Sequence, residues 1–255
     1  MTPPNRAARR RAKAGARADL RARIEGAPLP GTPGAVANRS RAALLAWIDA
    51  ARAQAWSEPR IAAALASGEA ATRISARIRE TILSDPPPTV RNAACAMGCA
   101  WCCVLDGPDG GTVSEAEARH LYAALAPLAG RPDGRDWHPM ACPSLDPETR
   151  ACRAYEDRPA LCRSFVSTDP EACRENASGG AMAGAGLIAS HLDHLAILAL
   201  ARAALGPSRV PTYALREVAA GAVEGLGEEE ALARARHPEK RLTQTRREMT
   251  AAAGS

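Results

Sequence analysis

The hydrophobic positions near the start of this chain follow helical spacing. Large apolar residues repeat at helical intervals, first at Leu44, Leu45, Trp47 and Ile48 and then at Ile61, Leu65, Ile74, Ile78 and Ile82. Asn38 precedes the first run and is a residue type that often caps a helix. Pro86, Pro87 and Pro88 end the second run, because proline cannot donate the backbone hydrogen bond of a helix interior. The pattern predicts a helical hairpin over residues 38–88.

Helical spacing returns after residue 113. Ser114 and Glu117 have the spacing of a capping box, which predicts a helix with Leu121 and Leu125 on its apolar side. The apolar run 187–205 predicts another helix, and 213–236 predicts one or two more. We therefore expect C-terminal helices over residues 179–240 and a charged, frayed tail over 241–255.

The segment between these helical regions, residues 89–178, has few regular periodicities and is rich in Pro, Asp and Cys. Only 3% of the chain is aromatic, so large side chains that could fill a core are scarce. A loop-rich segment with a poor core needs a cross-link. The expected fold is mainly α, with an irregular, cysteine-rich, metal-stabilised middle segment.

Charge and composition limit the classes of partner that we expect for this chain. Residues 1–37 are rich in Arg, Ala, Pro and Gly and contain few large apolar residues, so we expect a disordered basic arm. The net charge of +5 lies mainly in this arm, which has no interleaved aromatics, and no nucleic-acid partner is expected. No run of eighteen apolar residues exists, so no membrane partner is expected, and we expect a cytoplasmic protein. Whether the chain binds a protein partner stays open.

The chain's eight cysteines carry most of its candidate chemistry. They are Cys95, Cys99, Cys102, Cys103, Cys142, Cys152, Cys162 and Cys173. Four of them fall within nine residues, and thiolates this crowded repel one another unless a cation or a disulfide joins them. In a reducing cytosol such cysteines are more often metal ligands than disulfides. We therefore predict that all eight are candidate metal ligands.

The spacing of the first four cysteines limits how they can act. On one straight helix they would share a face but spread over about 12 Å, too far for one tetrahedral ion. Either the helix breaks or there are two metal positions, and Gly98 is the natural place for a break. Four arginines flank the cysteines, and each could offset thiolate charge or simply lie on the surface: Arg91, Arg153, Arg158 and Arg163.

The cysteines also carry a family resemblance. The first four form CxxxCxxCC, and Cys142-Pro143, Cys152, Tyr155, Arg158-Pro159 and Cys162-Arg163 follow downstream. Together with Phe165 and the helix opened by Ser114, these residues resemble the YkgJ-like cysteine-cluster family, described as zinc- or iron-chelating domains. The resemblance covers roughly residues 91–175. It implies metal chelation by the cysteines, with Cys173 the least well matched, and no settled reaction.

The metal and the reaction stay open at this stage. Widely spaced single cysteines that complete one dense cluster favour an iron–sulfur cluster slightly over zinc, which more often binds two CxxC pairs. We expect a metal-binding protein of unassigned reaction. Flagellin lysine methylases carry a similar cluster, so a methylase-like transferase or an accessory factor is one alternative. A metal-delivery module is another, and whether the chain is an enzyme is undecided.

Other motifs are weaker candidates. His191 and His194 lie on one face of an expected helix and could bind zinc or iron, but histidines near a helix start are more often capping or surface residues. His120 and His138 stand alone in the sequence. Gly184, Gly186 and Ala189 match GxGxxA without the buried strand that a dinucleotide loop follows. No Walker motif, HExxH or nucleophile elbow occurs.

Overall fold

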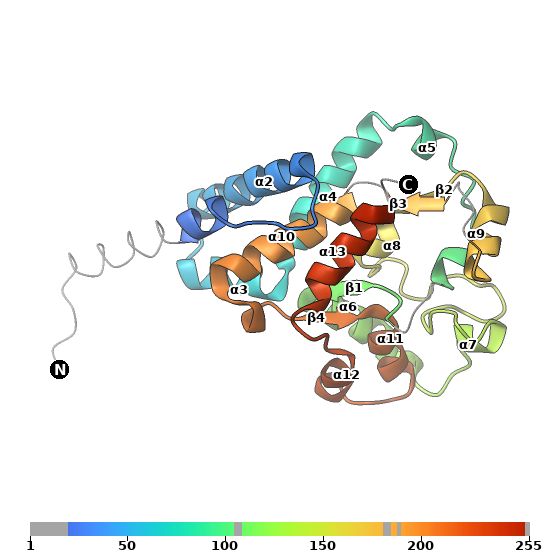
Figure 1. Cartoon of the computed structure of the whole chain (residues 1–255). Helices are drawn as coiled ribbons and strands as arrows, with labels where there is room; N and C mark the ends of the chain where they lie inside the picture. Colours follow the sequence, from blue (N-terminus) through green and yellow to red (C-terminus); the bar gives the residue numbers. More distant parts are fainter. Residues whose placement is uncertain (1–19, 105–108, 181–184, 188–189, 253–255) are drawn as a thin grey trace, which may run out of the picture.

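Helices dominate the described part of the chain, and its strands are only three residues long. The computed structural model describes residues 20–104, 109–180, 185–187 and 190–252 (Figure 1). The helices of the first half are α2 (Gly34–Ala53), α3 (Glu58–Ser67), α4 (Glu69–Ser84), α5 (Pro88–Arg91), the 3₁₀ helix η1 (Trp101–Cys103) and α6 (Glu115–Leu125). Those of the second half are η2 (Ala126–Leu128), α7 (Gly134–Trp137), α8 (Ala160–Ser164), α9 (Pro170–Ala177), α10 (Ser190–Leu205), η3 (Pro207–Arg209), α11 (Leu215–Val223), α12 (Glu228–Ala235) and α13 (Arg241–Ala252).

The strands form two short antiparallel pairs. β1 (Thr112–Ser114) pairs with β4 (Thr212–Ala214), and β2 (Phe165–Ser167) pairs with β3 (Ala185–Leu187). In the registers, Val113 faces Tyr213 and Val166 faces Gly186. Each pair therefore joins the middle of the chain to its C-terminal third.

Helix α10 is the centre of the larger core. It packs against α2, α3, α4 and α13, and its residues Leu195, Ile197, Leu198 and Leu200 are all fully buried. A helix that is apolar on every side has to be enclosed by others, as it is here. Two residues of α10 are charged, and both have partners. Asp193 is paired with Arg39 at 2.8 Å and accepts a hydrogen bond from Ser40 at 2.7 Å, while Arg202 donates to the Val210 carbonyl at 2.9 Å.

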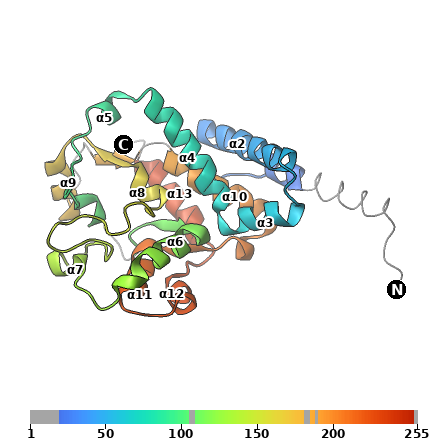
Figure 2. The same ribbon diagram turned by 180° about the vertical axis from the view of Figure 1, so that it is seen from behind.

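A second core lies between α6, α11 and α12 and includes the β1–β4 pair. Figure 2 shows α6, α11 and α12 in the lower part of the view, away from α2. The predicted capping box opens α6: the Glu117 amide donates to the Ser114 hydroxyl, and the Glu117 carboxylate accepts from the Ser114 amide. Cys142, Cys152 and Cys162 pack against this second core.

The mainly α fold with an irregular, cysteine-rich middle segment is confirmed. Among the described residues 89–178, the regular elements are short, from three residues in η1 to eight in α9 apart from α6. None of the described helices combines the length and the apolar character that a membrane span requires.

Both expected disordered ends are wrong where the structure describes them. Residues 20–25 are helical, and Ile24 and Ala27 are buried in the α10 core. Helix α2 begins at Gly34, after Pro33, rather than at Asn38. At the other end, α13 replaces the expected tail, because Leu242 is buried in the same core. Residues 1–19 and 253–255 lie outside the described residues.

Two helix predictions also need correction. The expected second helix of the hairpin is broken at Gly68, whose φ of +82° ends α3 and begins α4, so three helices occupy most of residues 38–88. The helix expected from Leu187 begins at Ser190, because Leu187 pairs with Phe165 in the β2–β3 ladder. The range 213–236 contains two helices, α11 and α12, after β4.

Candidate metal centre

All eight cysteines line a single cavity of about 610 Å³. They come from separated parts of the chain: the loop before η1, η1 itself, two turns between α7 and α8, and helices α8 and α9. No disulfide joins them, and each is a free thiol. The fold therefore gathers the downstream cysteines around the CxxxCxxCC segment, as a shared metal site requires.

The first cluster does not form a straight helix. Gly98 has a φ of +78°, a left-handed conformation that glycine adopts without strain, and it lies in a turn between Cys95 and Cys99. Cys102 and Cys103 follow on η1. The predicted break at Gly98 is confirmed, and it removes the 12 Å spread that a continuous helix would impose.

Cys142 and Cys152 are placed by backbone contacts. The Cys142 amide donates to the Cys103 carbonyl at 2.9 Å, which fixes one cysteine segment against the other. A β-bridge pairs Cys152 with Leu145. Gly134 at the start of α7 approaches so closely that an added Cβ would lie 2.3 Å from the Cys142 carbonyl oxygen.

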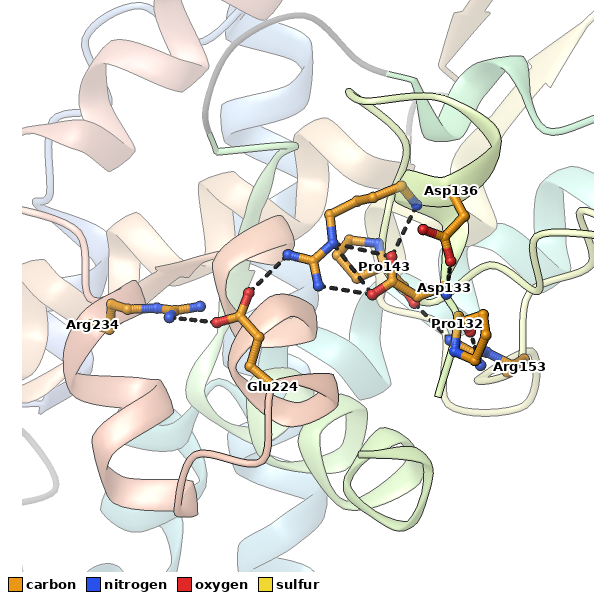
Figure 3. A network of polar contacts seen from close by, with 8 residues as sticks. Pro132, Asp133, Asp136, Pro143, Arg153, Glu224 and Arg234 are labelled. Carbon is orange, nitrogen blue, oxygen red and sulfur yellow. Dashed lines mark hydrogen bonds and ion pairs between the residues drawn. The ribbon is translucent and has the colours of Figure 1, made fainter. Parts of the chain in front are cut away.

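Arg153 connects the two turns that carry these cysteines. Its guanidinium donates to the carbonyls of Pro132 and Pro143 at 3.0 Å each, as Figure 3 shows. Beside it, Arg135 pairs with Asp133 at 2.7 Å and with Glu224 of α11 at 2.7 Å. Arg153 therefore stabilises the loop, and its charge also opposes the rise that burial causes in the pKa of Cys152.

Cys162 depends on a buried carboxylate for its position. Glu117 of α6 accepts a hydrogen bond from the Ala160 amide at 2.7 Å, at the first residue of α8, two positions before Cys162. The other Glu117 oxygen lies 3.1 Å from His194 Nε2 on α10. Burial alone would raise the pKa of Glu117, but His194 and the amides of Ala160 and Ser114 lower it to about 2. The carboxylate is thus a fixed charge that joins three helices.

Cys95 and Cys173 lie on either side of Ser167 in β2. The Ser167 amide donates to Cys95 Sγ at 3.4 Å, and the Ser167 hydroxyl hydrogen-bonds to Cys173. Cys173 lies on α9, which packs against η1. The end of β2 therefore anchors one edge of the cavity.

The charge of the cavity wall is positive. Its lining residues include Arg150, Arg158 and Arg216, and none of the lining residues in the described ranges is Asp or Glu. Arg158 lies over the Tyr155 ring, 3.6 Å from its centroid. Its charge favours the thiolate of Cys102 and opposes the rise that burial causes in the pKa of Cys152 and Cys162. Cations around thiolates reduce the cost of holding an anionic metal–sulfur group away from water.

The other flanking arginines contact backbone. Arg163 donates to the Arg158 carbonyl at 2.7 Å and to the Glu156 carbonyl, and Arg91 donates to Pro86. Arg163 therefore holds the turn that carries Arg158. Arg158 acts on the cysteines through its charge, as one of the two expected roles of the flanking arginines.

Burial and the crowding of the cysteines disfavour the ionised form of most of these thiols when no cation is bound. Burial raises the pKa of Cys142, Cys152 and Cys162, and neighbouring cysteines raise the last two further. A hydrogen bond from Cys103 lowers the pKa of Cys102 to about 7, while the same bond and burial raise that of Cys103. A bound cation would supply the positive charge that several thiolates in one cavity need.

The donor set fits a thiophilic metal. Eight sulfurs face one cavity, and the described part of its wall adds three arginines and no carboxylate. This set of donors is typical of zinc or iron sites and not of calcium or magnesium sites. Within the described ranges, no three His, Cys, Asp or Glu side chains already converge on a point where they could hold one ion. Metal binding therefore requires the cysteine side chains to move toward one another.

The histidine candidates lie elsewhere. His191 and His194 are fully buried in α10, so they are neither surface nor capping residues, and neither lines the cysteine cavity. His138 Nδ1 accepts a hydrogen bond from the Met140 amide at 3.1 Å, and His120 is exposed. Of the GxGxxA candidate, Gly186 lies in β3, while Gly184 and Ala189 fall outside the described residues.

Three residues that shape the site were not predicted from the sequence. They are Ser167, Arg216 and, in its contact with Ala160, Glu117. The capping box identified Glu117 as a local residue of α6, but its second contact is 43 residues away along the chain. Tyr155, named above only as part of the family motif, lines the cavity and is 56% exposed.

Comparison with known proteins agrees with the geometry. Residues 94–179 match a family model named CxxCxxCC and described as "Putative zinc- or iron-chelating domain". The match covers about a third of the chain and includes all eight cysteines, and it confirms the resemblance seen in the sequence. The family's name has two residues between its first two cysteines, where this chain has three. No curated protein and no solved structure gives a significant match.

Proposed function

We propose that this protein holds an iron–sulfur centre in its cysteine cavity. The observation that carries the proposal is that eight unpaired thiols line one cavity of about 610 Å³. A single zinc ion with Zn–S bonds of about 2.3 Å needs far less space. A polynuclear centre makes better use of the volume and of widely spaced single cysteines.

The cavity wall supports an anionic centre. Arg158 reaches three cysteines electrostatically, and Arg150 and Arg216 also line the cavity. When bound, an iron–sulfur cluster supplies one-electron transfer. The arginines favour its more negative, reduced state, because positive charge near the sulfurs stabilises added negative charge.

The neighbouring residues hold the thiols in place. Glu117 fixes the start of α8 through the Ala160 amide, and Arg153 joins the turns of Cys142 and Cys152. These contacts use backbone groups, so they leave the sulfurs free to bind metal. The proposed role is therefore a thiolate-held redox or structural centre.

The test is metal analysis of the full chain purified without oxygen. We expect iron and acid-labile sulfide in similar amounts and visible charge-transfer absorption. Cys162→Ser should lose most of both, whereas Met97→Leu should keep them, because the Met97 side chain is 96% exposed. Stoichiometric zinc without sulfide would show that the centre is a zinc site, and protein without bound metal would refute the proposal.

A further inference from the structure

We infer that the eight cysteines form two metal-binding positions of four thiolates each. The core set consists of Cys103, Cys142, Cys152 and Cys162. The β2 set consists of Cys95, Cys99, Cys102 and Cys173. This inference rests on the proposed function, and it specifies how the metal centre is divided.

The core set is held by the helical cores. Cys142, Cys152 and Cys162 pack against the core of α6 and α11, and Cys103 and Cys152 contact a smaller core formed by Ala100, Val104, Ala141 and Leu145. The Cys142 amide bonds to the Cys103 carbonyl at 2.9 Å, which ties the fourth member to the set. Cys142 and Cys152 are also the strongest charged neighbours of Cys162.

The β2 set is held by different elements. Cys95 contacts the backbone of Ser167 at 3.4 Å, and Cys173 contacts the hydroxyl of the same residue. The cysteines that act most strongly on Cys173 are Cys99, Cys102 and Cys95. All of these cysteines except Cys173 precede Cys103 in the chain, so the loop before η1, the middle of η1 and helix α9 build this set.

The boundary between the two sets lies within η1. Cys102 hydrogen-bonds with Cys103 and is also an electrostatic neighbour of both Cys162 and Cys173. Because the core set has four thiolates without Cys102, we assign Cys102 to the β2 set, where it completes a second group of four. A tetrahedral ion or a four-cysteine cluster takes four thiolates, so one position would leave half of these sulfurs unused.

The test uses Co²⁺ as the probe, added to the chelator-treated full chain without oxygen. Thiolate-to-cobalt absorption reports binding, and its end point counts the positions. We expect an end point of two equivalents for the wild type and for Met97→Leu. Cys142→Ser and Cys173→Ser should each give one, and the double variant none.

Cys95→Ser provides a second variant of the β2 set, because Cys95 is exposed and its loss does not disturb the packing. It should also give one equivalent. The division would be overturned if the wild type bound one equivalent of cobalt and variants of either set bound none. That result would leave the metal-binding function intact. Two equivalents in both β2-set variants would overturn the division as well. No cobalt binding in the wild type would overturn the division into two positions, while the iron and sulfide analysis decides the proposed function separately.

Discussion

The most distinctive prediction of this fold concerns His191, which α10 buries without charge compensation. Its side chain is 1% exposed, and its Nδ1 has no hydrogen-bond partner among the described residues. Burial lowers the pKa of His191 to about 3, and the neighbouring His194 acts in the same direction, against the opposing effect of Glu117. The ordinary value is 6.5. The folded protein therefore keeps His191 neutral at a pH where the unfolded chain protonates it.

The direction and size of the resulting pH dependence of the free energy of unfolding follow from proton linkage. Since the unfolded state binds the proton more readily, the free energy of unfolding falls as the pH drops below 6.5 toward the folded value. Each pH unit in this window is worth about 1.4 kcal/mol, so the loss between pH 6.5 and 4.5 is about 3 kcal/mol. The depressed pKa of Glu117 adds its own loss only below its ordinary value of 4.5. Burial also lowers the pKa of His237, which therefore contributes in the same window, but it does so equally in a variant that lacks only His191.

His191→Leu tests this reasoning, because leucine has a similar volume and cannot take up a proton. Urea unfolding at a series of pH values from 7 to 4.5, with both proteins in the same metal state, gives the difference in free energy of unfolding. The wild type should lose about 2 to 3 kcal/mol more than the variant over this range. Parallel curves for the two proteins would show that His191 is not held neutral by the fold.

Two further predictions concern packing. Gly134→Ala should reduce bound metal and cost about 1–3 kcal/mol of stability, because the new Cβ would meet the Cys142 carbonyl. Gly227→Ala is the matched control, because no atom lies within 4 Å of its new Cβ. Metal content and thermal unfolding measure both, and equal behaviour of the two variants would contradict the close approach. Leu198→Ala, in the α10 core, should cost about 2–5 kcal/mol in urea unfolding, while the 39% exposed Leu83→Ala should cost much less. A similar loss for both leucines would argue against α10 as the central helix.

The sequence predicted the fold where local signals sufficed. The Ser114 capping box and the turn at Gly98 involve neighbouring residues, and both occur as expected. The predictions of a disordered arm and a frayed tail were wrong, because the composition of a segment indicates only how much surface that segment can bury by itself. Ile24 and Leu242 are single large apolar residues in polar surroundings, and each is buried by a core built from distant helices.

The same limit applies to the candidate site: local features could be predicted from the sequence, and contacts between distant residues could not. The cysteine count and spacing predicted the donors, since soft ligands crowded together already indicate a metal. Spacing could not show that Ser167 contacts both Cys95 and Cys173, or that Glu117 reaches the start of α8. These contacts depend on β2 and α6, which the chain brings to the cavity only when both cores form. Because Glu117 lies in α6 and contacts His194 of α10, the same residue joins the two cores and the helix of Cys162. Metal binding at Cys162 should therefore depend on the packing of both cores, although none of their apolar residues is a metal ligand.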